Sequence, residues 1–383
     1  MKRNYIAKRF QSSGAGLSLD TEALAKYKDI IDLSIGDTDF TTDESIINAA
    51  FRDAKAGHTH YGDPKGDPEL IDAVCRAWEE DFGQRLPRDH VLVSASSCLG
   101  MALVMLAILD PGDEVIVFSP YFPMYREQIE LAGGVCVDVP TYASEDYAID
   151  EARLRAAITP RTKAIVFNNP TNPTGMGYDG KTLELLARVA QEHDLLIAAD
   201  EIYTTYLYEG DFRPIRTLPG MAERTITLNS FSKNFLMTGW RVGVIIAEPE
   251  LLAVMNRING SLIYSAPSVS QRAAIQALAM RKEIREKYVT AYRDRIFYSA
   301  DRIERLPYLS LVRPKGTFYL FPGVEKTGLD EKAFCKLLLD QAHVLVSPGT
   351  PFGVSAAGHF RIACTVGIDR LKAAFDRMEK LSF

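Results

Sequence analysis

The stretch "AIVFNNPTNPTGMGYDGKTLELLARVAQEHDLLIAAD" (164–200) decides the expected fold. It begins and ends with short apolar runs, at 164–168 and 195–200, and the second run ends on Asp200. Between them, residues 180–194 have the length and the pattern of a helix. Unbroken apolar strands joined by helices are typical of a parallel sheet that is covered on both faces. The stretch therefore predicts a strand, a crossover helix and a second strand.

Similar apolar runs recur along the chain, at 91–95, 114–119, 135–139, 225–229 and 242–247. After them come a charged helical pattern at 281–306, short strand signals at 316–322 and 359–365, and a helical pattern at 369–381. We expect an α/β fold with a mostly parallel seven-stranded sheet between helices and a second, smaller α+β domain. The expected large domain spans 45–280, and 1–44 together with 281–383 form the small domain.

The composition excludes several classes of protein. The 383 residues carry a net charge of −6 and no basic run, which argues against nucleic acid and anionic membranes as partners. The longest apolar stretch, 101–109, is too short to span a bilayer, and no secretory signal is recognisable. Five scattered cysteines without C-x-x-C favour reduced thiols in a cytoplasm, and the six histidines show no metal-ligand spacing.

Polar residues follow several of the predicted strands. "NPTNPTG" follows 164–168, Asp200 is followed closely by Tyr203, "SFSK" follows 225–229, and "SSCLG" follows 91–95. Ligands of open parallel sheets bind at the carboxyl ends of the strands. An amide, a carboxylate with a phenol, and a lysine with hydroxyls are therefore expected to line one site.

Lys233 lies in "NSFSKNFLMTGWRVG" (229–243), between small hydroxyl residues and an apolar run. Burial of an ammonium group lowers its pKa, and a neutral amine is a nucleophile. The alternative is a surface lysine whose stem covers apolar neighbours while its amine reaches water. Lys233 alone does not decide between them.

A second motif suggests a different activity. "GMGYDGKT" (175–182) satisfies the P-loop pattern G-x-x-x-x-G-K-[ST], and it lies between a predicted strand and a predicted helix. However, six residues with two prolines separate Asn168 from Gly175, whereas a P-loop leaves its strand almost directly. Nucleotide hydrolysis is kept as a distant alternative, and Lys181 is expected to be solvated.

Four motifs together resemble the class I/II aminotransferases, which are pyridoxal-phosphate enzymes of the aspartate-aminotransferase fold (fold type I). They are "NNPTNPTG", "DEIY", "SFSKNFLMTGWRVG" and "HFRIACT", and the resemblance runs from about residue 35 to the C-terminus. It implies that Lys233 forms a Schiff base with pyridoxal phosphate and moves the proton at the substrate α-carbon. Asp200 would face the pyridine nitrogen, unless it is a helix N-cap. Asn172 and Tyr203 would hydrogen-bond the ring hydroxyl oxygen.

The resemblance also implies how the rest of the cofactor is held. Ser230 and Arg241 would bind its phosphate, and Phe122 would stack on its ring. The turn 96–100 opens the expected helix 100–109, where Ser97 and Cys98 depart from the family's glycine or threonine. Tyr61 matches a tyrosine that reaches the phosphate from a neighbouring subunit, which implies a homodimer.

Substrate binding follows from the same resemblance. Arg361 would bind the substrate α-carboxylate as a bidentate pair, with help from Asn172 and the backbone of Gly36. In relatives that act on acidic substrates, a lysine stands where this chain has Cys98, and a thiol cannot pair with a distal carboxylate. The neighbouring aromatic residues are Tyr121, Phe122, Tyr125 and Tyr264. Neutral or aromatic amino acids are therefore the expected donors, with 2-oxoglutarate as acceptor.

Two alternatives share this fold. The same residues would serve a pyridoxal-phosphate-dependent lyase that cleaves C–S bonds by β-elimination. A cofactor-binding regulator would need a DNA-binding domain, for which there is no room before residue 35. Residues 1–20, with "SSGAG" as a hinge, are expected to close over the site.

Overall fold

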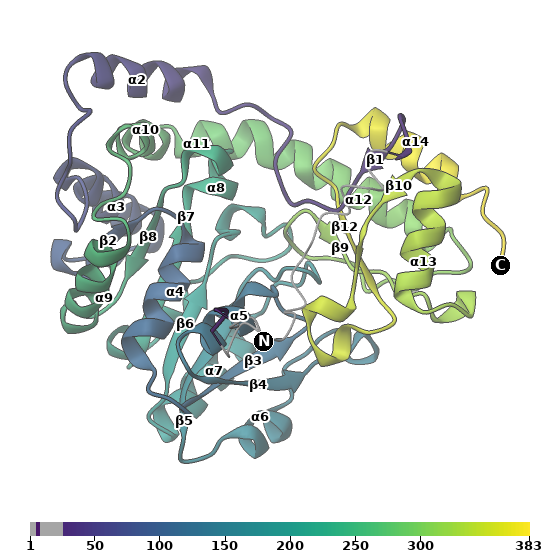
Figure 1. The fold of residues 1–383 in the computed structure, drawn as a ribbon, viewed down its shortest axis with the longest axis horizontal. Coiled ribbons are helices and arrows are strands. Elements are labelled where there is room, and N and C mark those ends of the chain that lie inside the picture. Colours follow the sequence, from purple (N-terminus) through teal and green to yellow (C-terminus); the bar gives the residue numbers. More distant parts are fainter. Residues whose placement is uncertain (1–4, 8–25) are drawn as a thin grey trace.

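The computed structural model describes residues 5–7 and 26–383 (Figure 1). Apart from residues 5–7, the segment predicted to close over the site lies outside the described residues. Within the described ranges, no helix is both long and apolar enough to cross a membrane.

A seven-stranded sheet forms the centre of the larger region, in the order β2-β8-β7-β6-β5-β3-β4. Neighbouring strands are parallel except at β8, which runs antiparallel to both β2 and β7. All seven predicted apolar runs are strands of this sheet. The strands are β2 (Val91–Ser94), β3 (Glu114–Ser119), β4 (Val135–Pro140), β5 (Thr162–Asn168), β6 (Leu196–Asp200), β7 (Thr225–Ser230) and β8 (Gly243–Ile246).

Helices cover both faces of this sheet, as the unbroken apolar strands predict. One face packs against α4 (Ser97–Ile108), α5 (Met124–Leu131) and α9 (Pro249–Leu262). The other face packs against α6 (Glu151–Ala157) and α7 (Gly180–Glu192) over its middle strands. At its β2–β8 edge the same face packs against α2 (Glu44–Lys55), α3 (Pro68–Phe82) and α10 (Ser268–Ala279).

A second region holds two small sheets and the C-terminal helices (Figure 1). Its strands are β1 (Ile31–Asp32), β9 (Tyr319–Leu320), β10 (Val344–Leu345), β11 (Ser347–Pro348) and β12 (Phe360–Ala363). Its helices are α13 (Glu331–Leu337), which continues into a π-helical turn (Leu338–Ala342), and α14 (Ile368–Met378). Short 3₁₀ turns occupy other connections, at Arg88–His90, Ala143–Glu145, Thr204–Tyr206, Ile215–Thr217, Ala222–Arg224, Thr238–Trp240, Glu325–Thr327, Thr350–Phe352 and Val354–Ala356.

The long charged pattern at 281–306 is helical but not uniform. It consists of α11 (Arg281–Ile284), a π-helical turn (Arg285–Val289) and α12 (Thr290–Glu304). The last helix ends at Met378, three residues before its predicted end. Ile31 and Leu33 belong to the core of the second region, whereas Phe40 packs against the core beside the large sheet. The domain division at 44/45 and 280/281 stays a prediction.

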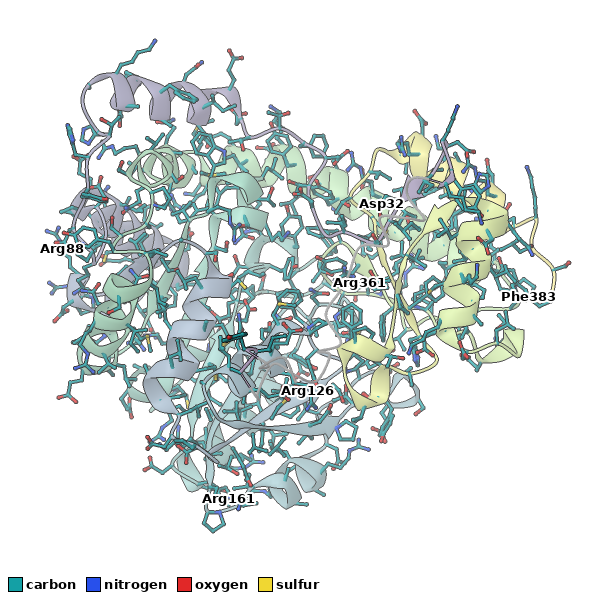
Figure 2. All side chains as sticks on the ribbon, in the orientation of Figure 1. Asp32, Arg88, Arg126, Arg161, Arg361 and Phe383 are labelled. Carbon is teal, nitrogen blue, oxygen red and sulfur yellow. The ribbon has the colours of Figure 1, made fainter. Side chains whose placement is uncertain are left out.

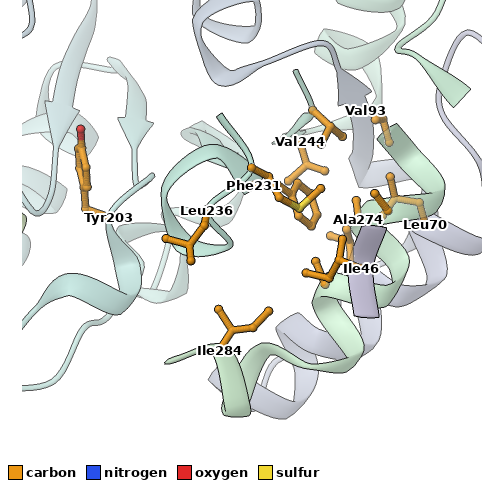
Figure 3. Close-up of a cluster of buried hydrophobic side chains, with 14 of the residues drawn as sticks. Ile46, Leu70, Val93, Tyr203, Phe231, Leu236, Val244, Ala274 and Ile284 are labelled. Atoms are coloured by element: carbon orange, nitrogen blue, oxygen red, sulfur yellow. The ribbon is translucent and has the colours of Figure 1, made fainter. Parts of the chain in front are cut away.

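A buried apolar cluster holds the short helix α8 (Phe231–Asn234), which carries Lys233 (Figure 3). Phe231, its first residue, lies beside Val244 of β8 in this cluster (Figure 3). Because Phe231 is only 3% exposed, the core fixes the helix two residues before the lysine. The packing of Phe231 in the core thus fixes the position of the backbone at Lys233.

Candidate active site

A cavity of about 1170 Å³ lies at the carboxyl ends of β5, β6 and β7 and extends to the second region. The residues lining it include every predicted site residue except Tyr61: Gly36, Ser97, Cys98, Phe122, Asn172, Asp200, Tyr203, Ser230, Lys233, Arg241 and Arg361. The residues expected at the strand ends thus line one cavity at the carboxyl edge of the sheet.

Asp200 is the last residue of β6 and lies opposite Asn168 of β5. Its Oδ2 accepts a hydrogen bond of 2.5 Å from the Tyr125 hydroxyl, whereas its buried Oδ1 has no hydrogen-bond partner in the described part of the chain. Burial raises the pKa of this carboxyl to about 6, and the Tyr125 hydrogen bond opposes that rise. The following 3₁₀ turn is capped by Tyr203, so Asp200 is not a helix N-cap.

Lys233 directs its amine into the cavity, where Nζ donates a hydrogen bond to the carbonyl oxygen of Gly36. Burial, together with the positive charges of Arg361 and Arg241 and against the attraction of Asp37, lowers the pKa of this amine to about 8. The hydroxyl of Ser230, expected as a polar neighbour of this amine, instead binds the backbone. Its Oγ accepts from the backbone N–H of Ser232 and caps α8. The alternative of a solvated surface lysine does not fit this geometry.

Arg361 lies on β12 and is only 4% exposed (Figure 2). Nη1 donates to Asn172 Oδ1 at 3.0 Å and Nη2 donates to the Ser34 carbonyl at 2.6 Å, while the buried Nε has no partner within residues 5–7 and 26–383. None of the carboxylates in the described chain forms an ion pair with this guanidinium. A buried cation without a counter-ion is costly, so the site favours an anionic ligand that uses the remaining N–H groups.

Tyr319 of β9, which was not among the predicted site residues, contacts both Tyr203 and Gly36. The hydroxyl oxygens of Tyr203 and Tyr319 lie 3.1 Å apart, and both rings are buried. A Cβ atom on Gly36 would lie 1.8 Å from the Tyr319 hydroxyl oxygen, so only glycine fits at position 36. The expected contact between the Gly36 backbone and the substrate stays a prediction.

The predicted phosphate-binding residues lie around two helix starts. Helix α4 begins at Ser97, three residues earlier than predicted, because Ser96 is its N-cap and accepts from the backbone N–H of Leu99. Ser97 and Cys98 thus belong to its first turn. Arg241 is exposed and adopts a left-handed backbone conformation (φ 54°), and its Nη1 donates to the Thr238 carbonyl.

The P-loop alternative fails on geometry. The carboxylate of Asp179 already caps α7, accepting hydrogen bonds from the backbone N–H and the hydroxyl of Thr182. Gly175 faces inward, and its carbonyl accepts from the backbone N–H groups of Lys315 and Gly316. Lys181 is exposed, as expected. No cradle for a phosphate is left at this helix start, because a carboxylate of the chain occupies it.

Tyr61 lies outside the cavity of its own chain. Its side chain is 88% exposed, and its ring is 5.1 Å from that of Tyr264, which is itself 47% exposed. Leu262 and Ile263 add further exposed apolar surface beside Tyr264. The role of Tyr61 across a homodimer interface stays a prediction.

Two hydrogen bonds in the site were not predicted from the sequence. Tyr125 entered it only as an aromatic neighbour of Cys98, and its bond to Asp200 joins residues 75 positions apart. Tyr319 and Tyr203 are 116 positions apart. Neither pairing leaves a local signal, because spacing predicts contacts only within one helix or between adjacent strands.

The sequence matches the family model for aminotransferases of class I and II over residues 28–378. The chain belongs to this family. The aminotransferase is 38% identical over 357 residues to the aspartate/prephenate aminotransferase of Thermus thermophilus, covering 92% of this chain and 91% of that one. It is 35% identical to the arginine–pyruvate transaminase of Pseudomonas aeruginosa, covering 99% and 97%.

Solved structures show the same fold. A single mutant of Thermus thermophilus aspartate aminotransferase superposes on this aminotransferase with a TM-score of 0.94 at 35% identity, covering 99% of this chain and all of that one. The aromatic aminotransferase of Pyrococcus horikoshii has a TM-score of 0.90 at 34% identity, covering 94% and 97%. The protein is an aminotransferase of the aspartate-aminotransferase fold, and its substrates are small amino and oxo acids.

Proposed function

We propose that this aminotransferase uses pyridoxal 5'-phosphate to move an amino group from a neutral or aromatic L-amino acid to a 2-oxo acid such as 2-oxoglutarate. One observation supports this most strongly. The amine of Lys233, the unpartnered Oδ1 of Asp200 and the counter-ion-free guanidinium of Arg361 all line one cavity. A nucleophile, a buried acceptor and an anion site are the groups that such a reaction requires.

The residues present fit the cofactor. The buried Oδ1 of Asp200 has no donor in the part of the chain that the structure describes, and a protonated pyridine nitrogen would supply one. Its positive charge would also favour the carboxylate form against the burial that raises the pKa of Asp200 to about 6. The first turn of α4, the cap residue Ser230 and Arg241 would hold the phosphate. Phe122 would stack on the ring, and Asn172 and Tyr203 would hydrogen-bond its hydroxyl oxygen.

When bound, the cofactor supplies an aldehyde and an electron-withdrawing ring that accepts the electrons of the substrate Cα–H bond. The chain supplies the proton transfer. Because the pKa of Lys233 is lowered to about 8, a useful fraction of its amine is neutral near neutral pH and accepts the α-proton. The Gly36 carbonyl orients this amine through its hydrogen bond.

Arg361 would fix the substrate by its α-carboxylate. Its Nε–H and the unused hydrogens of its terminal nitrogens are free for a bidentate pair, while Asn172 and Ser34 hold the guanidinium in place. The backbone of Gly36 would approach the same carboxylate. Because Arg361 is buried, its ion pair with the carboxylate would be stronger than the same pair in water.

The charges around the cavity support the choice of amino donor. Cys98 lines the cavity where acidic-substrate relatives carry a lysine. In the described part of the chain, the carboxylates that line the cavity are those of Asp200 and Asp340, and Asp340 is already bound by Lys336, Tyr27 and Lys26. Among the described residues a cationic side chain therefore finds no free acidic partner in the cavity. Lys26, Lys332 and Lys336 also line the cavity, so the proposed preference for neutral or aromatic side chains over acidic ones rests on Cys98.

The assembly and location belong to the same proposal. We infer a cytoplasmic homodimer in which Tyr61 of one subunit reaches the cofactor phosphate of the other. The exposure of Tyr61, Tyr264 and Leu262 supports an interface at this surface. The five free cysteines suit a reducing compartment. We also propose that residues 45–280 form the large domain, and that 1–44 with 281–383 form the small domain.

Product analysis tests the activity. The purified protein is incubated with pyridoxal phosphate, phenylalanine and 2-oxoglutarate, and phenylpyruvate, glutamate and ammonia are measured. Equal amounts of phenylpyruvate and glutamate without ammonia are expected. With an S-alkyl cysteine in place of phenylalanine, release of a thiol, pyruvate and ammonia without glutamate would indicate the lyase alternative. Arg361→Gln should lower kcat/KM by roughly 100-fold, because a buried charge pair contributes about 2–5 kcal/mol.

A further inference from the structure

The residue that joins the predicted cofactor and substrate sites is Tyr319. Its hydroxyl oxygen lies 3.1 Å from that of Tyr203, and a Cβ atom on Gly36 would collide with it. Its ring lies beneath the guanidinium of Arg361, with 4.7 Å between the guanidinium carbon and the ring centroid. It therefore contacts three residues to which separate roles are assigned.

The hydroxyl of Tyr319 needs an explanation beyond packing. The side chain is only 2% exposed, and an apolar phenylalanine would fill the same space without the cost of burying a polar group. In the described chain, Tyr203 is the one hydrogen-bond partner that the Tyr319 hydroxyl has. The Tyr203 hydroxyl likewise bonds to Tyr319 alone there.

The direction of this bond depends on where each phenol directs its hydrogen. Each phenol has one hydrogen to donate and can also accept. Both side chains line the cavity, so either hydroxyl could direct its hydrogen there. The proposed function decides between them. If Tyr203 gives its one hydrogen to the ring oxygen of the cofactor, its own oxygen is left to accept, and Tyr319 is the donor in this bond.

We propose that Tyr319 is a positioning residue: its hydroxyl donates to Tyr203, turning the Tyr203 hydrogen toward the cofactor, while its ring supports Arg361. The inference rests on the proposed function, because the acceptor for Tyr203 is the ring oxygen of pyridoxal phosphate. Donation from Tyr319 polarises the Tyr203 hydroxyl and strengthens its own donation by roughly a tenth to a third. The ring of Tyr319 stabilises the guanidinium by a cation–π contact.

Two substitutions separate the two roles. Tyr319→Phe removes the hydroxyl and keeps the ring, whereas Tyr319→Leu removes both. A donor to the ring oxygen favours loss of the proton from the lysine-bound cofactor, so its weakening raises the pH at which the visible band of the loaded protein titrates. Tyr319→Phe should raise that midpoint by about 0.2 to 0.5 pH unit and leave KM for the amino acid nearly unchanged. Tyr319→Leu should also raise KM roughly 3- to 30-fold.

Tyr308→Phe is the matched control. Tyr308 is also buried and its hydroxyl donates to the Met378 carbonyl at 2.6 Å, but it does not line the cavity. Its removal should leave the midpoint unchanged. A Tyr319→Phe midpoint equal to that of the unsubstituted protein would refute the inference and leave the proposed function intact. Absence of any visible band in the unsubstituted protein would instead refute the proposed function.

Discussion

The hydroxyl of Tyr125 donates a 2.5 Å hydrogen bond to one oxygen of Asp200, and the other buried oxygen has no partner among the described residues. This bond fixes the carboxylate at the end of β6 and opposes the burial that raises the pKa of Asp200 to about 6. One oxygen is thus held by the protein and the other is left for a ligand.

Tyr125→Phe should raise the pKa of Asp200 further, because it removes the hydrogen bond that stabilises the charged form. A protonated Asp200 has lost the negative charge that pairs with a protonated pyridine nitrogen. The affinity for pyridoxal phosphate should therefore fall on acidification through about pH 6 in the unsubstituted protein, and at higher pH in the variant. Equilibrium dissociation constants measured across this range test the shift. Identical pH profiles would show that Tyr125 does not tune Asp200.

The burial of Lys233 predicts how the stability of the cofactor-free protein depends on pH. Burial lowers the pKa of its amine in the folded chain to about 8, below its ordinary value. A lowered pKa means that its contribution to stability is complete above the unfolded pKa and is lost as pH falls through about 8. Lys233→Met removes this loss, so the variant should gain in Tm over the parent protein at pH values below 8 and gain little well above it. An equal difference in Tm between variant and parent below pH 8 and well above it would contradict the burial of the Lys233 amine.

Cys98 makes a prediction about specificity. The parent protein should have a higher kcat/KM for phenylalanine than for aspartate or arginine. Cys98→Lys places a cation in the first turn of α4 at the cavity wall, so it should raise the aspartate-to-phenylalanine ratio of kcat/KM by roughly 10-fold, equivalent to about 1.4 kcal/mol. Cys98→Ser is the neutral control and should leave the ratio unchanged. A parent enzyme that prefers aspartate would overturn the substrate proposal.

Tyr61 makes a prediction about assembly. If it serves the site of the partner subunit, Tyr61→Ala should weaken cofactor affinity by roughly 10-fold, the loss of one charge-assisted hydrogen bond. Mixing and reassociating Tyr61→Ala with inactive Lys233→Ala should then restore activity, because each hybrid dimer contains one site with both native residues. A mixture no more active than its parts, despite formation of hybrids, would show that Tyr61 does not act across the interface.

The strands of the sheet could be predicted because each is a continuous apolar run. The antiparallel direction of β8 could not be predicted, because buried parallel and antiparallel strands have similar composition. Strand ends brought Asn172, Asp200 and Lys233 to one edge from sequence alone. Arg361 was identified only by resemblance, because it comes from another sheet. The bonds made by Tyr125 and Tyr319 depend on how helices and sheets pack, for which the local pattern carries no information.

The absorption spectrum of the protein loaded with pyridoxal phosphate tests whether Lys233 binds this cofactor. Parent protein and Lys233→Ala are each incubated with pyridoxal phosphate, freed of excess and scanned before and after addition of phenylalanine. The parent should show a visible band that shifts with the amino acid, and the variant should show an altered spectrum without a lysine-dependent band. Absence of such a band in the parent, or the same band and the same shift in Lys233→Ala, would contradict the role of Lys233 in this account.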